Sequence, residues 1–394
     1  MFYQLLHPVR FWHNRTLSEV GELYISTTIR SIAMGVVGIF WPFYLYEQGL
    51  GIHGVILFCI VFFLSRSIFD ILSAYIIALI GPKHTMMISY VLQIMAAFSL
   101  FAVGEYGWSP LYAGVTWGIS NSLFYVALHV DFSKIKHSKK SGSEYSFLQI
   151  AQRMGMALGP LGGGMVAFVF GPKYIFLVAL VLMFAAFIPL LLSPEPTKTH
   201  QHISFRGLPF RALRRDIFSY ICLAAENNLR GISWPLFLSL FALGSSVYVK
   251  LGAISTLGLI VSIATAYVTG KLVDNKKGKL LLDVSAFLAA ALHSVRAFVN
   301  SLPFAATVMI AGDIATVGYQ IPYHKGLYDK VDTLPGNRIT YISFLECCGS
   351  VTKLVVWIVL ASMVGLQGVK GLLVCTFAVC ALLSLGITQQ RFKL

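Results

Sequence analysis

Charge is scarce in this chain. Only 12% of its 394 residues are charged, and 16 acidic residues stand against 30 lysines and arginines. Hydrophobic residues make up 57% of the chain and its mean hydropathy is +0.76. A water-soluble body of this length needs more polar surface than that. The composition therefore predicts an integral membrane protein.

Several motifs of enzymes are also absent. The sequence has no P-loop and no glycine-rich nucleotide fingerprint, which excludes ATP hydrolysis through these motifs as an energy source. It has neither an H-x-x-x-H motif nor a paired C-x-x-C motif. All six cysteines fall in hydrophobic stretches, where they behave as small apolar side chains. We therefore expect no enzyme activity, no cofactor, no resident metal and no disulfide framework.

Hydrophobic stretches dominate what is present. A helix needs about 20 apolar residues to cross the roughly 30 Å of hydrocarbon in a bilayer. Twelve such stretches occur, so the sequence predicts an all-α membrane protein with twelve transmembrane helices. Their approximate limits are 23–46, 53–80, 85–103, 109–130, 146–170, 173–193, 217–243, 247–270, 280–300, 302–322, 339–364 and 368–388.

A repeat divides these stretches into two sets of six. The segment Trp41–Leu45 (WPFYL) in the first stretch returns as Trp234–Leu238 (WPLFL) in the seventh, 193 positions later. An offset of half the chain predicts two similar six-helix lobes, at 1–193 and 217–394. Prolines and basic residues interrupt the hydrophobic pattern between them, which predicts a cytoplasmic linker over 194–216.

Basic residues are distributed very unevenly between the predicted loops. If the N-terminus is cytoplasmic, 21 lysines and arginines lie in cytoplasmic segments, and Lys173, Lys250 and Lys370 lie on the other side. By the positive-inside rule this places both termini in the cytoplasm of a multi-pass plasma (inner) membrane protein. The net charge of +14 is then a result of topology, and we expect no nucleic-acid partner.

The loop after the eighth stretch carries a recognisable motif. Gly270–Lys279 (GKLVDNKKGK) is close to G-x-L-x-D-R-x-G-R-R, with one extra residue before the second glycine. With twelve spans in two related halves and a long basic middle loop, the chain resembles the major facilitator superfamily. That resemblance implies that Gly270 and Asp274 belong to a latch across the lobe interface. The first-half counterpart, Ile80–His84, has no acid.

A second motif lies in the fifth stretch. The segment Gly155–Gly164 matches G-x-x-x-G-P-x-x-G-G, a pattern that the resemblance associates with drug/proton antiporters. Glycines at helical spacing allow another helix to approach closely, and a proline bends the helix. We expect a gating interface between the lobes here, although any tight helix contact needs small residues. The arginine that accompanies this pattern in the fourth span is absent. The predicted interface residues are Arg153, Gly155, Gly159, Pro160, Gly163 and Gly164.

Ten charged residues fall inside the hydrophobic stretches. Each costs roughly 2.5–3.5 kcal/mol if it faces lipid near the bilayer centre, so they must face a cavity or one another. Arg66 and Asp70, like Glu226 and Arg230, stand four residues apart and can neutralise each other on one helix face. The ten are Arg30, Arg66, Asp70, Arg153, Glu226, Arg230, Arg296, Asp313, Glu346 and Lys353.

The seventh stretch is the most polar. Between Glu226 and Pro235 it combines an acid, two amides, an arginine and a glycine, which predicts a broken or bent helix at a binding site. The resemblance implies that the first, fourth, seventh and tenth helices line a central cavity. The predicted substrate and proton pathway comprises Arg30, Trp41, Asn121, Tyr125, His129, Glu226, Asn227, Arg230, Trp234, Asp313, Gln320, His324 and Glu346.

Three acids in this set are candidate proton carriers. Asp313 has no basic residue at i±3 or i±4, and desolvation disfavours its charged form, so it can exchange a proton near neutral pH. Glu226 and Glu346 are the others. His129 and His324, 195 positions apart, suit proton coupling or a gate, or simply interfacial anchoring. Arg30 and Arg153 are candidates for binding an anionic group or pairing with the acids.

These features favour a monomeric secondary transporter that works by alternating access and exports small amphipathic or organic molecules in exchange for protons. Three alternatives remain open. One is a proton-coupled uptake symporter. Another is a divalent-metal exporter of the ferroportin-like kind, with ligands from His129, Cys222 or Asp313. The third is a receptor or scaffold that uses a transporter fold without transport.

Overall fold

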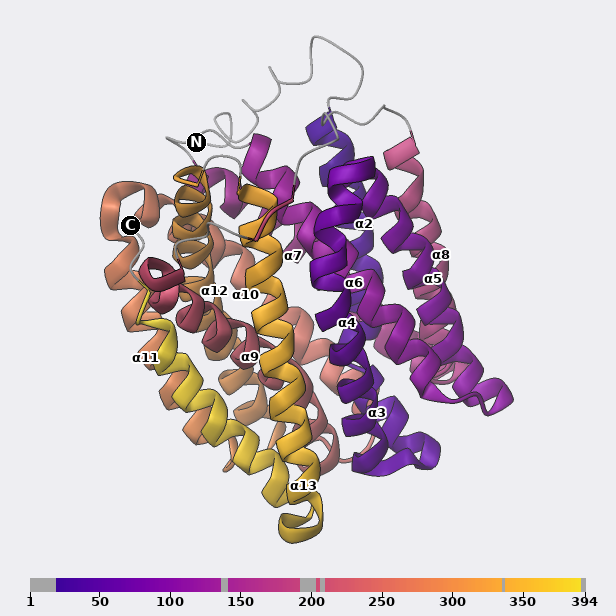
Figure 1. Ribbon diagram of the computed structural model, residues 1–394. Helices are drawn as coiled ribbons and strands as arrows, with labels where there is room; N and C mark the ends of the chain where they lie inside the picture. The colour runs from indigo at the N-terminus through magenta and orange to yellow at the C-terminus, as the bar shows by residue number, and fades with distance from the viewer. Residues whose placement is uncertain (1–18, 136–140, 192–202, 206–209, 335–336, 391–394) are drawn as a thin grey trace, which may run out of the picture.

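The computed structural model describes residues 19–135, 141–191, 203–205, 210–334 and 337–390, and the regular elements within them are all helical (Figure 1). The elements are α2 (Glu19–Gly38), α3 (Trp41–Leu45), η2 (Tyr46–Leu50), α4 (Gly51–Ile80), α5 (Pro82–Tyr106), α6 (Pro110–Ile135), α7 (Ser141–Phe170), α8 (Tyr174–Phe187), η3 (Ile188–Leu191), α9 (Phe210–Phe241), α10 (Val247–Leu272), η4 (Val273–Lys277), α11 (Gly278–Arg296), α12 (Leu302–Asp332) and α13 (Arg338–Ile387).

Helical segments coincide with each of the predicted spans. Seven runs among the described residues are long and apolar enough to cross a membrane, and the longest three hold two predicted spans each: Gly21–Ile80, Val247–Arg296 and Arg338–Ile387. Within α13, Gly368 adopts φ 64° and ψ 171°, which separates the last two spans. The polar helices α6 and α9 complete the set. The all-α membrane fold predicted from the sequence is confirmed.

The break in regular helix lies in the first span, not in the seventh. Helix α2 ends at Gly38, and α3 begins at Trp41. Pro42 lies in the first turn of α3, where the backbone N–H that proline lacks would have no acceptor within the helix. In contrast, α9 is helical from Phe210 to Phe241 with Pro235 inside it. The seventh helix is therefore not broken, and a bend at Pro235 stays a prediction. Its polar side chains find partners on neighbouring helices, so its backbone need not unwind to satisfy them.

Helix packing follows the two halves of the chain. In the first half, α2 packs on α7 and α8, while α6 packs on α4 and α5. In the second half, α9 packs on α13, and α12 packs on α10 and α11. Two extensive contacts join the halves: α7 with α10, and α4 with α13. The space between these two seams lies at the middle of the molecule and is lined mainly by α4, α6, α9, α12 and α13.

The glycine motif of α7 faces mainly α2, a helix of the same half. A Cβ on Gly155 would lie 2.5 Å from the Thr28 carbonyl oxygen, and one on Gly163 would lie 2.6 Å from that of Val36. Gly159 likewise contacts the α2 backbone. Residues four apart share one helix face, whereas the next position points about 100° away.

Only part of the motif therefore meets the second half. A Cβ on Gly164 would lie 2.6 Å from the carbonyl oxygen of Tyr248 on α10, and the Pro160 carbonyl approaches Gly252 of the same helix. The expectation that the whole motif packs between the halves is wrong for Gly155, Gly159 and Gly163.

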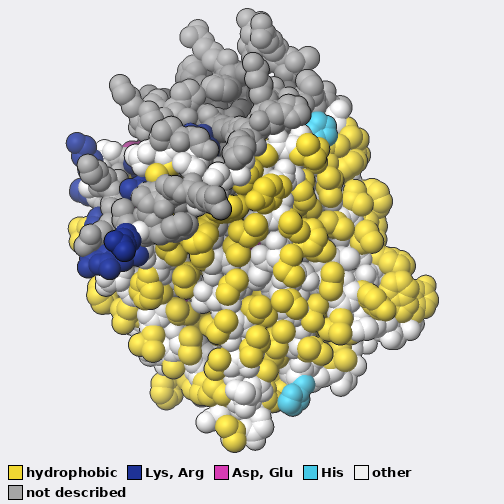
Figure 2. Space-filling view, in the orientation of Figure 1, with side chains coloured by type: hydrophobic (Ala, Val, Ile, Leu, Met, Phe, Trp, Pro, Cys, Tyr) yellow, Lys and Arg dark blue, Asp and Glu magenta, His cyan; other side chains and the backbone are white. Residues whose placement is uncertain are grey.

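The surface of the molecule is apolar along its flank and basic at one end (Figure 2). Large hydrophobic side chains such as Leu79, Phe168 and Phe298 are 65–74% exposed. An apolar surface this extensive fits lipid and is not stable in water. We call the end at which α9 begins and α10 ends the basic end, because Arg211, Arg214, Arg215, Lys271, Lys276, Lys277 and Lys279 lie there.

Candidate functional site

A polar cavity of about 500 Å³ lies between the halves. Nine of the residues predicted for the pathway line it, and so does the predicted interface residue Arg153; the nine are Asn121, Tyr125, His129, Asn227, Arg230, Asp313, Gln320, His324 and Glu346. Arg66 and Lys353 also line it, although the sequence marked them only as charges within spans. Tyr220 and Tyr328 line it too, and nothing in the sequence singled them out.

A smaller, aromatic cavity of about 220 Å³ adjoins the polar one. The rings of Trp41 and Phe58 are 4.6 Å apart, and Trp117 meets Trp41 edge-on at 6.0 Å. We call this space the aromatic chamber; its other ring-bearing linings are Phe62 and Phe63. The residues that line both cavities are Phe62, Phe63, Asn121, Asn227 and Asn228. The two cavities are therefore neighbouring parts of one site.

A buried cluster on α4 and α13 closes one wall of the polar cavity. Arg66 donates from Nη2 to Oε2 of Glu346 at 2.7 Å, and Asp70 accepts at Oδ2 from Ser350 at 2.5 Å. Tyr220 donates its hydroxyl to the second oxygen of Glu346 at 2.5 Å. The predicted pair of Arg66 with Asp70 is longer, 3.7 Å. The tertiary fold therefore gives Arg66 a better partner on the opposite half than its own helix offers.

The structure brings His129 and His324 into contact, which the sequence did not predict. Their rings are stacked with centroids 5.9 Å apart. Nδ1 of His129 lies 2.6 Å from the Tyr328 hydroxyl, and its Nε2 lies 3.6 Å from Glu346. Because His129 is on α6 and its partners are on α12 and α13, this contact links the two halves near the basic end.

Glu226 lies behind the cavity wall at the centre of a second buried network. Its Oε1 accepts from Arg230 at 3.0 Å, as the sequence predicted, and also from Nε2 of His293 at 3.0 Å. Its Oε2 accepts from Tyr319 at 2.6 Å. Arg296 donates to Nδ1 of His293 at 2.8 Å, which fixes the proton of the neutral ring on Nε2. Sequence reasoning missed His293, whose signal was a histidine inside an apolar stretch.

Asp313 has a different environment from the other two acids. It lines the polar cavity and has no hydrogen-bond or ion-pair partner among the residues that the structure describes. Arg153, Arg230 and Arg296 nevertheless lie near enough to interact electrostatically with its carboxylate. The sequence showed no cation on the same helix face, but the fold brings three from other helices. Asp313 is thus less isolated than its sequence neighbours indicated.

Amide side chains connect the two halves across the cavity. Arg153 on α7 donates to Gln320 on α12 at 3.2 Å and to Ser262 on α10 at 3.1 Å. Gln320 in turn donates to Asn227 on α9 at 2.9 Å. Asn228, which was not among the predicted pathway residues, accepts from Trp357 at 2.9 Å. Arg153 therefore bridges the halves, as an interface residue must.

Other predicted residues lie outside both cavities. Arg30 is 3% exposed, donates to Asn121 at 3.2 Å and stacks over Phe124 at 3.5 Å. Trp234 packs on Phe237 and Phe377, and Arg296 lies over its ring at 5.0 Å. Arg30 and Trp234 are therefore buried residues that pack behind the residues lining the cavities.

The predicted latch residues are also remote from the cavities. Gly270 is buried in the last turn of α10, and Asp274 lies in the turn η4, where Lys276 adopts φ 61°. Neither lines the polar cavity or the aromatic chamber.

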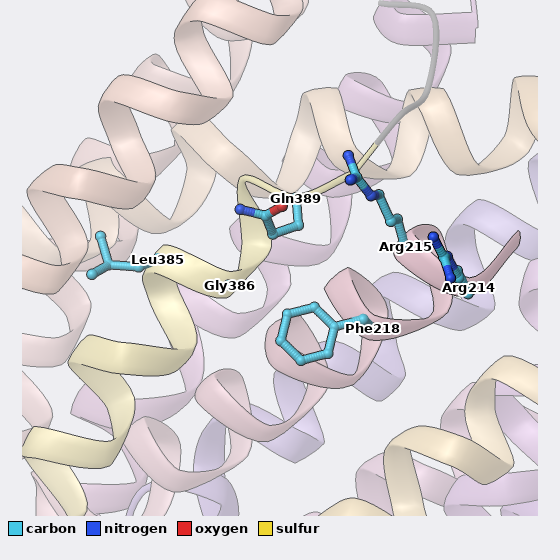
Figure 3. Close-up of a pocket in the computed structure, with 6 residues that line it drawn as sticks. All are labelled: Arg214, Arg215, Phe218, Leu385, Gly386 and Gln389. Carbon is cyan, nitrogen blue, oxygen red and sulfur yellow. The ribbon is translucent and has the colours of Figure 1, made fainter.

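A separate surface pocket of about 540 Å³ lies at the basic end (Figure 3). Arg214, Arg215 and Phe218 of α9 line it together with Leu385 and Gly386 of α13 and Gln389 just beyond that helix. It shares no lining residue with the central cavities and contains none of the predicted pathway residues. Of the predicted linker, 194–202 and 206–209 lie outside the described residues.

Metal ligands do not gather in the part of the chain that the structure describes. No group of three or more histidines, cysteines, aspartates and glutamates is arranged to hold an ion there. Cys222 packs against Gly386 of α13, away from His129 and Asp313. The alternative of a metal exporter therefore has no ligand set in the described residues.

The sequence itself decides the family. A profile of the Major Facilitator Superfamily matches residues 23–324. The chain belongs to the Major Facilitator Superfamily. No curated protein sequence matches it significantly. Membership makes this an integral multi-pass membrane protein of a transporter family, and points to a transporter rather than an enzyme.

Solved structures share its fold. It is similar to the human organic anion transporter MFSD10 (TETRAN), with 13% identity, a TM-score of 0.70, and coverage of 93% of this chain and 98% of that one. The E. coli fucose:proton symporter FucP matches with 12% identity, a TM-score of 0.64 and coverage of 93% and 98%. A bacterial homologue of the iron transporter ferroportin, in an outward-facing state, matches with 14% identity, a TM-score of 0.65 and coverage of 93% and 97%.

Proposed function

We propose that this chain is a secondary active transporter that exports a small molecule by alternating access, in exchange for protons. Family membership supports transport, and the polar cavity between the halves supplies a binding site at the expected place. The observation that carries proton exchange is Asp313, a cavity-lining carboxylate without a hydrogen-bond or ion-pair partner in the described chain. Binding a proton there changes the charge of the cavity without breaking an existing ion pair.

The other two acids fit structural roles better. Glu226 accepts from Arg230, His293 and Tyr319, so its charge is already satisfied. Glu346 accepts from Arg66 and Tyr220. Protonating either would sacrifice a strong, charge-assisted hydrogen bond. Asp313 is therefore the preferred proton carrier. Glu346 is the second choice, because protonation of Glu346 would weaken its contact with Arg66 between the halves.

Alternating access requires two bodies that rock against each other. We propose lobes at 1–193 and 217–394, joined by a linker at 194–216, with the seams α7–α10 and α4–α13 as their moving contacts. Arg153, Arg66 and His129 make hydrogen bonds or ion pairs across the halves. The distribution of lysine and arginine supports a cytoplasmic basic end, with both termini on that side of a plasma (inner) membrane. We propose that the transporting unit is the monomer, because its cavity lies within one chain.

Flux in liposomes tests this function. The purified protein is reconstituted into vesicles that contain a pH-sensitive dye, and candidate substrates are added outside without an imposed pH gradient. An antiporter driven by inward substrate flow releases protons from the vesicle and raises its internal pH. A symporter carries protons inward and lowers it.

Two further outcomes of this experiment separate proton coupling from transport, and transport from a receptor role. Substrate flux with no proton movement overturns proton coupling but not transport. Binding without any flux, in protein whose folding is verified after reconstitution, supports the receptor or scaffold instead.

A further inference from the structure

The polar cavity carries an excess of positive charge. Among the described lining residues, four are lysine or arginine and two are acids. Arg66 already pairs with Glu346, and Arg230 with Glu226 behind the wall. A desolvated cavity with excess cation is stabilised by an incoming negative charge. The four basic residues are Arg66, Arg153, Arg230 and Lys353.

Among the cavity-lining cations, Lys353 has no hydrogen-bond acceptor in the part of the chain that the structure describes. Its side chain is 7% exposed and lines the polar cavity on α13. Within the described ranges its ammonium has no hydrogen-bond acceptor and no ion-pair partner, although Arg66, Glu346 and Asp70 lie near enough to interact with it electrostatically. The ring of Phe63 lies 5.4 Å from Nζ. An ammonium has three donors and no acceptor, so burial without a partner is costly unless a ligand supplies the oxygen atoms.

The position of Lys353 also indicates what the rest of the ligand is like. Phe63, the ring beneath its ammonium, lines both the polar cavity and the aromatic chamber. A negative group at Lys353 therefore lies at the boundary between the two spaces. The chamber beyond, walled by Trp41, Phe58 and Trp117, offers contact to an apolar or aromatic body.

We propose that the site binds an organic anion whose carboxylate pairs with Lys353 and whose apolar body occupies the aromatic chamber. This names the substrate class of the transporter proposed above and rests on that function for the movement of the anion, but not for its binding. Asp313 and Lys353 then have separate tasks. The aspartate exchanges the proton, while the lysine recognises the substrate charge.

Three probes that share a phenylalkyl group but differ in charge test the proposal. They are the anion phenylbutanoate, its neutral amide phenylbutanamide, and the cation phenylbutylammonium. Binding to the purified protein is measured by calorimetry and by the shift of the unfolding midpoint. We expect the carboxylate to bind about 10- to 100-fold more tightly than the amide, as expected of a hydrogen bond to a charged group. The ammonium compound should bind more weakly than the amide.

Substitutions assign this preference to one residue. Lys353→Gln should reduce the affinity for the carboxylate to that for the amide, while Lys353→Arg keeps most of it. Lys370→Gln, on the exposed stretch of α13 beyond Gly368, is the matched control and should change neither. Unfolding midpoints without ligand show that each variant is folded.

Several results would overturn the proposal. These are equal affinity for the three probes, preference for the cation, no binding of any arylcarboxylate from benzoate to phenylbutanoate, or unchanged selectivity in folded Lys353→Gln. Failure of the transporter function looks different: the carboxylate binds through Lys353 but does not cross the liposome membrane. Flux of some other substrate without carboxylate binding rejects the substrate class and leaves transport standing.

Discussion

Arg66 on α4 and Glu346 on α13 form a buried ion pair between the two halves of the molecule, with 2.7 Å between Nη2 and Oε2. Their side chains are 9% and 6% exposed. The hydrogen bond from Ser350 to Asp70, one turn along the same helices, crosses the same seam. Any motion that separates α4 from α13 must break both links.

Removing one partner of this pair should be strongly destabilising. Arg66→Gln leaves the Glu346 carboxylate buried without its cation, which costs about 3–5 kcal/mol in comparable buried pairs. The double variant with Glu346→Gln should recover part of that loss, because the Glu346 charge is gone while Asp70 still lacks the cation 3.7 Å from it. Thermal unfolding of the purified single and double variants measures the coupling. Arg338→Gln breaks an exposed pair with Asp332 and serves as the control. Strictly additive effects would contradict the prediction.

Asp313→Asn should uncouple transport from protons. The amide keeps the shape of the carboxylate but cannot titrate, so accumulation driven by a pH gradient should be lost while exchange without a gradient survives. Asp283→Asn on α11, outside both cavities, should leave both activities intact. Gradient-driven uptake with unchanged pH dependence in Asp313→Asn would transfer the role to Glu346 or Glu226.

Gly258→Ala should disturb the same carboxylate indirectly. A Cβ at Gly258 on α10 would collide with Oδ2 of Asp313, so the carboxylate must shift. We expect weaker proton coupling than in the wild type, but less loss than in Asp313→Asn, with stability changed by no more than about 1 kcal/mol. Gly365→Ala has open space around its new methyl group and is the matched control. Equal coupling in both glycine variants would show that the position of Asp313 is not critical.

Gly159→Leu should prevent close packing of α7 on α2. A Cβ at Gly159 would lie 2.5 Å from the Val36 amide nitrogen and 2.6 Å from Cα of Gly35. Backbone atoms cannot move aside as a side chain can, so we expect a loss of stability above about 3 kcal/mol. Gly162→Leu should be tolerated, because a Cβ at Gly162 would have no neighbouring atom within 4 Å. Size-exclusion elution profiles and thermal unfolding midpoints are compared between the Gly159→Leu and Gly162→Leu proteins. Similar midpoints for the two variants would contradict close packing of α7 on α2.

The exposed pair of Lys173 and Glu105 tests electrostatics at the ends of two membrane helices, because Lys173 precedes the apolar run Tyr174–Leu191 and Glu105 lies in the last turn of α5. The hydrogen bond with Glu105 raises the pKa of Lys173 above its ordinary value of 10.5. Its stabilisation is therefore complete below the ordinary pKa and is lost as pH rises through the raised one. Solvent screens such pairs strongly. Lys173→Gln should hardly change the unfolding midpoint near neutral pH, and any difference should vanish in strongly alkaline buffer. A difference that grows with pH would contradict this sign.

Local sequence predicted the helices because their causes are local. Apolar stretches of about 20 residues must form helices in a bilayer, where every backbone group needs a partner within the segment. The positions of the spans and the pair of Glu226 with Arg230 follow from spacing along the chain. The contact between His129 and His324 instead required the tertiary structure. The glycines of α7 do allow another helix to approach closely, as predicted, but for Gly155, Gly159 and Gly163 that helix is α2 and not a helix of the second half.

The membrane class, the helical spans and a shortlist of polar residues within them can therefore be predicted from the amino-acid order. The partner that each polar residue takes depends on how the helices pack. Arg66 prefers Glu346, 280 residues away, to Asp70 on its own helix, and Asp313 gains three arginines from other helices. Helix packing also places Lys353 beside an aromatic chamber, with no hydrogen-bond or ion-pair partner among the described residues. Pairing energies depend on distance and burial in three dimensions, and a sequence reports only the neighbours along one helix.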